Sequence, residues 1–303
     1  MYFFHLNQFV VESEIAFPCD RESRSATLHS DADALVIRRA DLKSKLPLLH
    51  RVRPQRHYDV DDGVLVNMGA ILIWIALDGR YALVDAPDEA LPQAALWMLN
   101  KCFAFCTLFR GGLPIHAAGA QLDGKFFGLI APSGTGKSTL LWSLVQSGAL
   151  FGNDDLIAAH ERNGEIVGFP SVSLQPKVRT ESLQNIGGSH IENARESTPD
   201  SGEFWMPLDS SQRVLEPAPL HALFLLQPSE NASEAQATRV RTAVARAVLP
   251  VCIHGYEFWS THFARTEDER LEKLSQRVPF FILQYPKRFD ALPQLCREIH
   301  AQL

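Results

Sequence analysis

Apolar runs separated by turn-forming residues dominate the first third of the chain. Three of them are residues 63–68, 70–77 and 81–86. Runs of this kind, bounded by Asp, Gly and Pro, predict β-strands joined by tight turns. Residues 88–112 begin with acidic side chains and end with a glycine pair, which predicts a helix. We find no chemical motif before residue 113 and expect residues 1–112 to form an α+β region, with substrate docking as its candidate role.

The pattern changes at residue 113, where two apolar runs flank the turn Asp123-Gly124 and predict a β-hairpin. The second run leads into a glycine-rich loop. Residues 137–148 then carry apolar side chains at helical spacing and predict a helix that ends at a glycine. The short run 149–155 predicts a strand, and a second hairpin turns at Asn163-Gly164.

Polar residues rich in Gly, Ser and Pro occupy positions 183–204, which predicts a long exposed loop. Apolar patterning further along predicts a strand at 220–228, helices at 233–253 and 267–278, a strand at 280–285 and a helix at 289–303. This succession of strands and helices predicts an α/β fold. We expect it to form one domain over residues 113–303, beside the smaller, β-rich N-terminal region.

The glycine-rich loop, Ala131–Thr139, reads A-P-S-G-T-G-K-S-T. Gly134 and Gly136 allow the backbone to turn so that successive N–H groups point at phosphate oxygens, and the following helix adds its partial positive charge. Lys137 is placed to reach the β and γ phosphates, and the Ser138 hydroxyl to ligate Mg²⁺. The sequence therefore predicts a site for ATP, or another nucleoside triphosphate, with Mg²⁺. Its candidate binding residues are Ser133, Gly134, Thr135, Gly136, Lys137, Ser138 and Thr139.

Two adjacent aspartates, Asp154 and Asp155, lie shortly after this loop. Only one predicted helix and one short predicted strand separate them from Lys137. In a strand–loop–helix–strand unit the end of the second strand lies beside the phosphate loop. Because neighbouring residues at a strand end point to different sides, one carboxylate can hold Mg²⁺ while the other accepts a proton from an attacking hydroxyl. A polar turn without chemistry is the alternative.

A histidine, His116, lies in the apolar run that precedes the first hairpin turn. Taken by itself, a histidine in an apolar strand is more often a hydrogen-bonded core residue than a functional one.

Together these features resemble the HPr kinase/phosphorylase family. The likeness is carried by L-P-I-H at 113–116, S-G-T-G-K-S at 133–138 and an apolar strand ending in Asp154-Asp155. The chain is most similar to the HPr-kinase-related kinases found beside peptide-tailoring genes, including the lasso-peptide kinases. The resemblance covers residues 113–180 best. It implies a P-loop nucleotide-binding core of the HPr kinase and phosphoenolpyruvate carboxykinase type, and phosphorylation of a serine in a protein or peptide.

The resemblance also implies roles for single residues. Asp154 would be the base on the acceptor hydroxyl, with Lys137 on the transferred phosphate. Asp155 and Ser138 would attend the metal, and His116 would orient the acidic pair. Two basic residues further along, Lys177 and Arg179, would clamp the transferred phosphoryl group. Solvated surface charges are the alternative for those two.

The sequence departs from the family pattern at three points. Ala131 replaces the first glycine of G-x-x-x-x-G-K-[ST], which a backbone with negative φ accommodates. Thr139 follows Ser138, where the HPr kinases carry Glu, and their later signature loop is not found. We therefore do not expect phosphorylase activity, or HPr as the substrate.

Composition narrows the range of partners. A formal net charge of −6 and a pI near 6.0 give no bulk attraction to nucleic acid or to an anionic membrane. Five scattered cysteines, no basic stretch at the N-terminus and no apolar run of membrane-spanning length predict a cytoplasmic protein with free thiols. Cys102 and Cys106 are expected to be buried packing residues. A homo-oligomer is in keeping with the resembling family.

The function expected is a Mg²⁺- and ATP-dependent kinase acting on a Ser or Thr hydroxyl of a peptide, with a ribosomal natural-product (lasso) precursor as the candidate substrate. A small-molecule kinase on the same core is the main alternative. A transport ATPase or switch protein needs a carboxylate after a later strand, but the run 220–228 ends in Gln227 and Pro228. A binding module without catalysis is disfavoured by the intact Lys137, Ser138 and aspartate pair.

Overall fold

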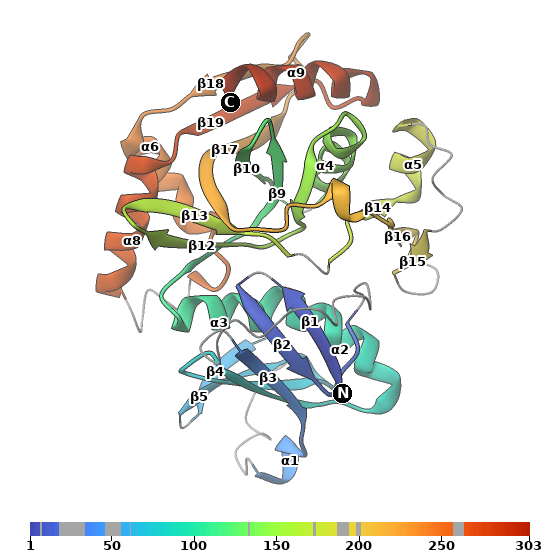
Figure 1. Cartoon of the computed structure of the whole chain (residues 1–303), viewed down its shortest axis with the longest axis vertical. Helices are drawn as coiled ribbons and strands as arrows, with labels where there is room; N and C mark the ends of the chain where they lie inside the picture. Colours follow the sequence, from blue (N-terminus) through green and yellow to red (C-terminus); the bar gives the residue numbers. More distant parts are fainter. Residues whose placement is uncertain are drawn as a thin grey trace.

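The computed structural model describes residues 1–6, 8–17, 34–45, 56–60, 62–132, 134–171, 174–186, 194–197, 201–256 and 264–303. The protein is mixed α/β and has two parts stacked along its long axis, each built on its own large sheet (Figure 1). No helix in these ranges is long and apolar enough to cross a membrane.

The first sheet has seven described strands in the order β1-β2-β3-β7-β6-β5-β4. They are β1 (Tyr2–Leu6), β2 (Phe9–Ser13), β3 (Ala34–Arg39), β4 (Arg56–Val60), β5 (Gly63–Asn67), β6 (Leu72–Ala76) and β7 (Tyr81–Asp85); a short helix, α1 (Leu42–Lys45), follows β3. β2–β3 and β3–β7 pair in parallel and the other pairs are antiparallel. The three apolar runs of the N-terminal region thus form β5, β6 and β7, as predicted.

The helix predicted at 88–112 is confirmed, with an irregularity in its middle. A 3₁₀ turn (Asp88–Ala90) leads into α2 (Leu91–Trp97), a π-helical turn (Met98–Cys102) and α3 (Phe103–Phe109). Gly111, with φ of 86°, follows the helix end. Cys102 and Cys106 are fully buried in it, as expected for packing residues. Figure 1 places α3 between the two sheets.

The second sheet has nine described strands. Seven follow the order β11-β9-β10-β17-β13-β12-β8, and β19 joins β17 and β18 beside that path. They are β8 (Leu113–Ile115), β9 (Ala117–Leu122), β10 (Lys125–Ile130), β11 (Leu150–Asn153), β12 (Ile157–Arg162), β13 (Glu165–Phe169), β17 (Ala218–Pro228), β18 (Gln236–Arg239) and β19 (Phe280–Tyr285). Both hairpins are confirmed: β9 pairs with β10, and β12 with β13. Asp123 and Asn163 have φ near 50° and precede glycines of positive φ, as a two-residue hairpin turn requires.

The helix after the glycine-rich loop, α4 (Lys137–Gln146), connects β10 to β11. In the sheet these strands are separated by β9, which is antiparallel to both. β10 and β11 therefore run in the same direction, and their C-terminal ends lie at one edge of the sheet. This arrangement brings the loop after β10 and the aspartates after β11 together.

Helices cover both faces of the second sheet (Figure 1). Side chains of α4 and of α9 (Leu292–Gln302) pack with Phe127 and Phe224 on one face. On the other face, residues of α6 (Thr242–Val248) and α8 (Ala264–Arg277) pack with Phe126 and Ile157. Successive residues of β10 thus face opposite layers, as the pleat of a strand dictates.

Two sequence predictions are wrong in part. The stretch 183–204, expected as a loop, contains the end of α5 (Thr180–Ile186) and the strands β15 (Arg195–Glu196) and β16 (Glu203–Trp205). These strands form a small sheet with β14 (Lys177–Arg179). The helix predicted at 233–253 is instead β18, α6 and a 3₁₀ turn, because residues 236–239 pair with the open edge of β19. The remaining strands and helices agree with their predictions, with α8 starting a few residues early.

Candidate nucleotide-binding site

The glycine-rich loop connects the end of β10 to the first turn of α4. Gly134 and Gly136 have φ of 79° and 102°, a left-handed region that favours glycine. Gly136 is the N-cap of α4, and its carbonyl accepts the Leu140 N–H at 2.9 Å. The Tyr285 hydroxyl donates to the Thr135 carbonyl at 2.9 Å and ties the loop to the end of β19. Ser133 lies outside the described residues.

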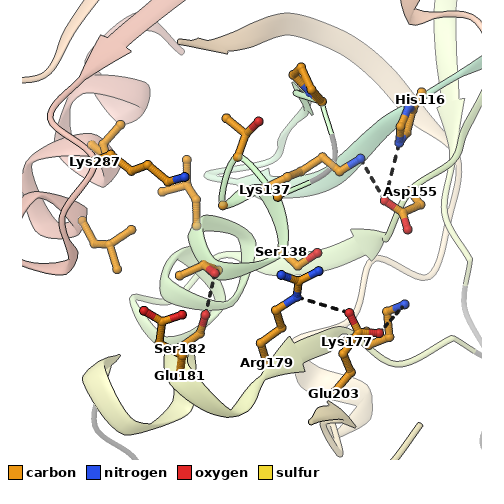
Figure 2. A pocket seen from close by; sticks show the side chains of 18 of the residues that line it. His116, Lys137, Ser138, Asp155, Lys177, Arg179, Glu181, Ser182, Glu203 and Lys287 are labelled. Carbon is orange, nitrogen blue, oxygen red and sulfur yellow. Dashed lines mark hydrogen bonds and ion pairs between the residues drawn. The ribbon is translucent and has the colours of Figure 1, made fainter. Parts of the chain in front are cut away.

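A cavity of about 730 Å³ opens in front of this loop. Its volume is in the range of small-ligand sites. Figure 2 shows Lys137 in the middle, with Asp155 and His116 at one end and Lys287 at the other. The residues that line it are Asn100, Lys101, His116, Pro132, Gly134, Thr135, Gly136, Lys137, Ser138, Thr139, Leu140, Asp155, Lys177, Arg179, Glu181, Ser182, Glu203, His254, Tyr285, Lys287, Arg288, Phe289, Leu292 and Leu295.

Asp155 is the centre of the charged cluster. Its Oδ1 lies 2.8 Å from Lys137 Nζ and 3.7 Å from His116 Nε2. The contact with Lys137 is an ion pair rather than a well-aligned hydrogen bond. Burial alone would raise the pKa of Asp155, but His116 and Lys137 outweigh it and hold this pKa well below its usual range. Asp155 is therefore an ionised carboxylate facing the cavity.

Asp154 lies behind Asp155 and is buried, with 8% of its surface exposed. The Ser138 hydroxyl donates to its Oδ1 at 3.3 Å, and the Lys177 backbone N–H donates to its Oδ2 at 3.1 Å. Burial, followed by repulsion from Asp155, raises the pKa of Asp154 to about 6. The adjacent carboxyls thus differ strongly in proton affinity, a pattern found where one acts in proton transfer and the other stays charged.

His254 belongs to this cluster, although nothing in its sequence neighbourhood indicates it. Its Nε2 lies 3.0 Å from the backbone oxygen of Asp155, and its ring packs against that of His116 with 4.5 Å between centroids and a tilt of 32°. A β-bridge between Ile115 and Ile253 holds the two segments together. Burial, followed by the positive charge of His116, lowers the pKa of His254 to about 4. His254 is therefore neutral near pH 7, and its Nε2–H donates to the carbonyl.

Lys177 and Arg179 project into the cavity from β14 (Figure 2). Both are paired with Glu203 of β16, Lys177 at 3.0 Å and Arg179 at 3.3 Å. Glu203 was not found by sequence reasoning, because it lies in a stretch that was predicted as a loop. Thr139, on α4, shares a hydrogen bond of 2.7 Å with Ser182 of α5, which connects this side of the cavity to the glycine-rich loop.

The chain offers a donor set suited to Mg²⁺. Among the described residues no three His, Cys, Asp or Glu side chains form a metal site. Mg²⁺ does not need one, since it is usually held by one or two carboxylates, waters and the phosphates of the substrate. The Ser138 hydroxyl and the Asp155 carboxylate both line the cavity and supply oxygen donors beside the glycine-rich loop, so the residues fit this metal.

Comparison with known proteins gives little beyond this geometry. No protein-family model matches the sequence, and no curated protein matches it. Among solved structures, the chain is similar to the Hpr(Ser) kinase/phosphatase from Coxiella burnetii. The identity is 12% and the TM-score 0.35, over 62% of this chain and 94% of that chain. A likeness of this strength carries no functional argument, so the case for a function stands on the residues of the cavity.

Proposed function

We propose that this protein is a Mg²⁺-dependent kinase that transfers the terminal phosphoryl group of a nucleoside triphosphate to a Ser or Thr hydroxyl of a peptide. One observation carries the proposal. The phosphate-binding lysine, Lys137, lies 2.8 Å from the cavity-facing carboxylate of Asp155, and a second carboxyl, Asp154, lies against Ser138. Phosphoryl transfer needs a held donor, neutralised phosphate charge and a group that takes the acceptor proton.

The nucleotide would lie along the cavity with its phosphates on the loop. Lys137 would reach the β and γ phosphates, as the loop motif requires. The opposite end is walled by apolar side chains of the chain's C-terminal segment, among them Phe289 and Leu292, and suits a nucleobase. The γ-phosphate would then point toward Asp155 and His116.

The two aspartates would divide the remaining work. Bound Mg²⁺ would neutralise charge on the β and γ phosphates. Asp155, kept ionised by Lys137 and His116, and Ser138 would hold it. Asp154, whose pKa is raised to about 6, would accept the proton of the acceptor hydroxyl. The acceptor oxygen forms a bond to the γ-phosphorus while the bond to the bridging β–γ oxygen breaks, and the nucleoside diphosphate leaves.

Lys177 and Arg179 would clamp the transferred phosphoryl group. Glu203 holds both side chains at the cavity wall. A γ-phosphate arriving beside them offers a stronger, doubly charged partner, so at least one cation would transfer from Glu203 to phosphate oxygens.

The peptide substrate rests on the sequence resemblance, and a ribosomal natural-product precursor is the class it indicates. A direct test incubates the full chain with Mg²⁺, ATP and candidate precursor peptides, and reads added phosphate by mass spectrometry. Phosphate on a Ser or Thr is the expected result. Phosphate that appears only on small hydroxyl compounds would instead favour a small-molecule kinase.

Three variants test the assigned roles. Lys137→Met should weaken nucleotide binding itself. Asp154→Asn should bind nucleotide normally but lose transfer by at least about a hundredfold, the usual contribution of a general base. Asp155→Asn should mainly raise the Mg²⁺ concentration needed for half-maximal rate. If Asp154→Asn keeps its turnover while Asp155→Asn loses it at saturating Mg²⁺, the roles of the two aspartates are exchanged.

A further inference from the structure

Two residues of the N-terminal part reach into the nucleotide cavity. Asn100 and Lys101 line it, and no other described residue before 113 does. Both lie on the π-helical turn Met98–Cys102 between α2 and α3. Wider turns of this kind inside a helix are frequent at functional sites. The N-terminal part thus contributes side chains to a cavity whose other lining residues all lie at or after His116.

Lys101 lines the cavity together with His116, Asp155 and His254. Its positive charge is one of the causes, after burial and His116, that lower the pKa of His254. The segment that carries Lys287 and Phe289 forms the other end, as Figure 2 shows for Lys287. With a nucleotide seated as proposed above, Lys101 would line the same cavity as the γ-phosphate and its acceptor.

Among the residues that the structure describes, no carboxylate neutralises the charge of Lys101. Lys137 is paired with Asp155, and Lys177 with Glu203. Lys101 is exposed and makes no ion pair with any residue that the structure describes. A lysine held at a cavity wall without a carboxylate partner is available for an anionic group of a ligand.

We propose that Asn100 and Lys101 form the acceptor subsite of the kinase, and that Lys101 selects peptides with a carboxylate close to the phosphorylated hydroxyl. This inference rests on the proposed function. A lysine side chain extends about 6 Å and an extended peptide advances about 3.3 Å per residue, so the carboxylate belongs within about two residues of the hydroxyl. The Asn100 amide, a donor and acceptor, suits the peptide backbone.

In this proposal Lys101 contacts the acceptor peptide and Lys287 contacts the nucleotide. Alanine variants of these two lysines therefore form a matched pair. Lys101→Ala should leave the affinity for a non-hydrolysable ATP analogue with Mg²⁺ within about twofold of wild type. Lys287→Ala, at the nucleobase end, should weaken it about fivefold or more, the effect of one lost charge-assisted contact. Isothermal titration calorimetry on the full chain measures both without any acceptor.

A second experiment tests acceptor recognition with synthetic peptides that differ at one position, with Asp, Asn or Lys next to the acceptor Ser. Wild type should have a KM about five- to tenfold lower for the Asp peptide than for the Asn peptide, because one ion pair separates them. Lys101→Ala should remove this preference by raising the KM for the Asp peptide, and Lys101→Glu should favour the Lys peptide. Asn100→Ala should raise the KM for all three.

Each contrary outcome has a separate meaning. If Lys101→Ala weakens binding of the ATP analogue and leaves the peptide preference intact, Lys101 is a phosphate contact and the acceptor subsite is wrong. If wild type phosphorylates the three peptides equally well, the carboxylate selection is wrong while the kinase stands. If nucleotide binds and none of the peptides, nor any candidate precursor, gains phosphate, the peptide-kinase function itself is overturned.

Discussion

Asp155 holds an unusual backbone conformation at the centre of the site. Its φ of 67° lies in the left-handed region, which aspartate tolerates better than most residues but which still costs about 1 kcal/mol or more. The hydrogen bond from His254 to the Asp155 carbonyl fixes this conformation. The Asp155 carboxylate is thereby aimed at Lys137 and His116, so His254 acts on the site through Asp155.

His254→Ala removes the donor to the Asp155 carbonyl. We expect the rate of phosphoryl transfer to fall about tenfold to a hundredfold, since displacement of a catalytic group by about 1 Å has effects of this size. Nucleotide affinity should change little, because the loop residues remain in place. Steady-state kinetics with separate kcat and KM values checks this.

His254→Gln tests whether the donated hydrogen bond is what matters. Glutamine retains an N–H donor at similar reach, so it should restore part of the lost kcat. Equal loss in both variants, together with an equal fall in the melting temperature, would show that the ring serves packing alone.

A second histidine, His160, makes the free energy of unfolding depend on pH. Its Nε2 is buried beside Gly112 without a hydrogen-bond partner. Burial, followed by the positive charges of Arg162, Arg270 and Arg110, lowers the pKa of His160 from 6.5 to about 4. As pH falls from about 6.5 to 4, the unfolded chain binds a proton that the folded protein does not, so the free energy of unfolding decreases by on the order of 3 kcal/mol.

Replacing His160 with glutamine, which does not titrate, should flatten this part of the stability profile. Urea unfolding at several pH values between 4 and 7 measures it. A glutamine at the exposed His221 controls for the general loss of a histidine. An unchanged slope in His160→Gln would mean that other groups carry the acid sensitivity.

At the scale of elements, local signals were sufficient where neighbours in sequence are also neighbours in space. The turns at Asp123 and Asn163 and the helix after Gly136 depend on local backbone geometry, and each was predicted. The sequence predicts a helix at β18 because the strand conformation of this segment depends on pairing with the open edge of β19, more than forty residues further along. The π-helical turn at Met98–Cys102 has no sequence signal that we know.

Glycines on three strands of the second sheet make room for the ring of Phe126. A Cβ added to Gly119, Gly152 or Gly168 would come within 2.7, 2.4 and 2.5 Å of ring atoms. Gly152→Ala should therefore destabilise the protein by about 1–3 kcal/mol, the usual effect of overpacking a core. Chemical denaturation measures the change.

A double-mutant cycle provides the control for Gly152→Ala. In a Phe126→Leu background the smaller side chain leaves space for the new methyl group, so the penalty should shrink markedly. A penalty that is the same in both backgrounds would trace the effect to the nearby Gly119 carbonyl, 3.1 Å from the added Cβ.

At the scale of the whole molecule, the site is assembled from segments far apart in sequence. The sequence identified Lys137, Ser138 and the aspartate pair, and the structure places His116 beside them. The sequence alone could not identify Asn100, Lys101, His254 or Glu203, because their contribution depends on which loops meet at the sheet edge. The division of the chain near residue 112 remains a prediction, and one apolar core cluster includes residues from both sides of it.

Ligand binding should therefore slow amide hydrogen exchange in both parts of the protein, first on nucleotide binding and then on peptide binding. We expect a non-hydrolysable ATP analogue with Mg²⁺ to slow amide hydrogen exchange in the phosphate loop, in the first turn of α4 and around Lys177 and Arg179, because these segments contact the phosphates in the proposed complex. An acceptor peptide with an acidic residue should then add protection at Met98–Cys102, while β1 and β2, which contribute no residue to the cavity lining, stay unchanged. Protection at the π-helical turn by nucleotide alone would place Lys101 on the phosphates, and the N-terminal part would then belong to the nucleotide site rather than to acceptor recognition.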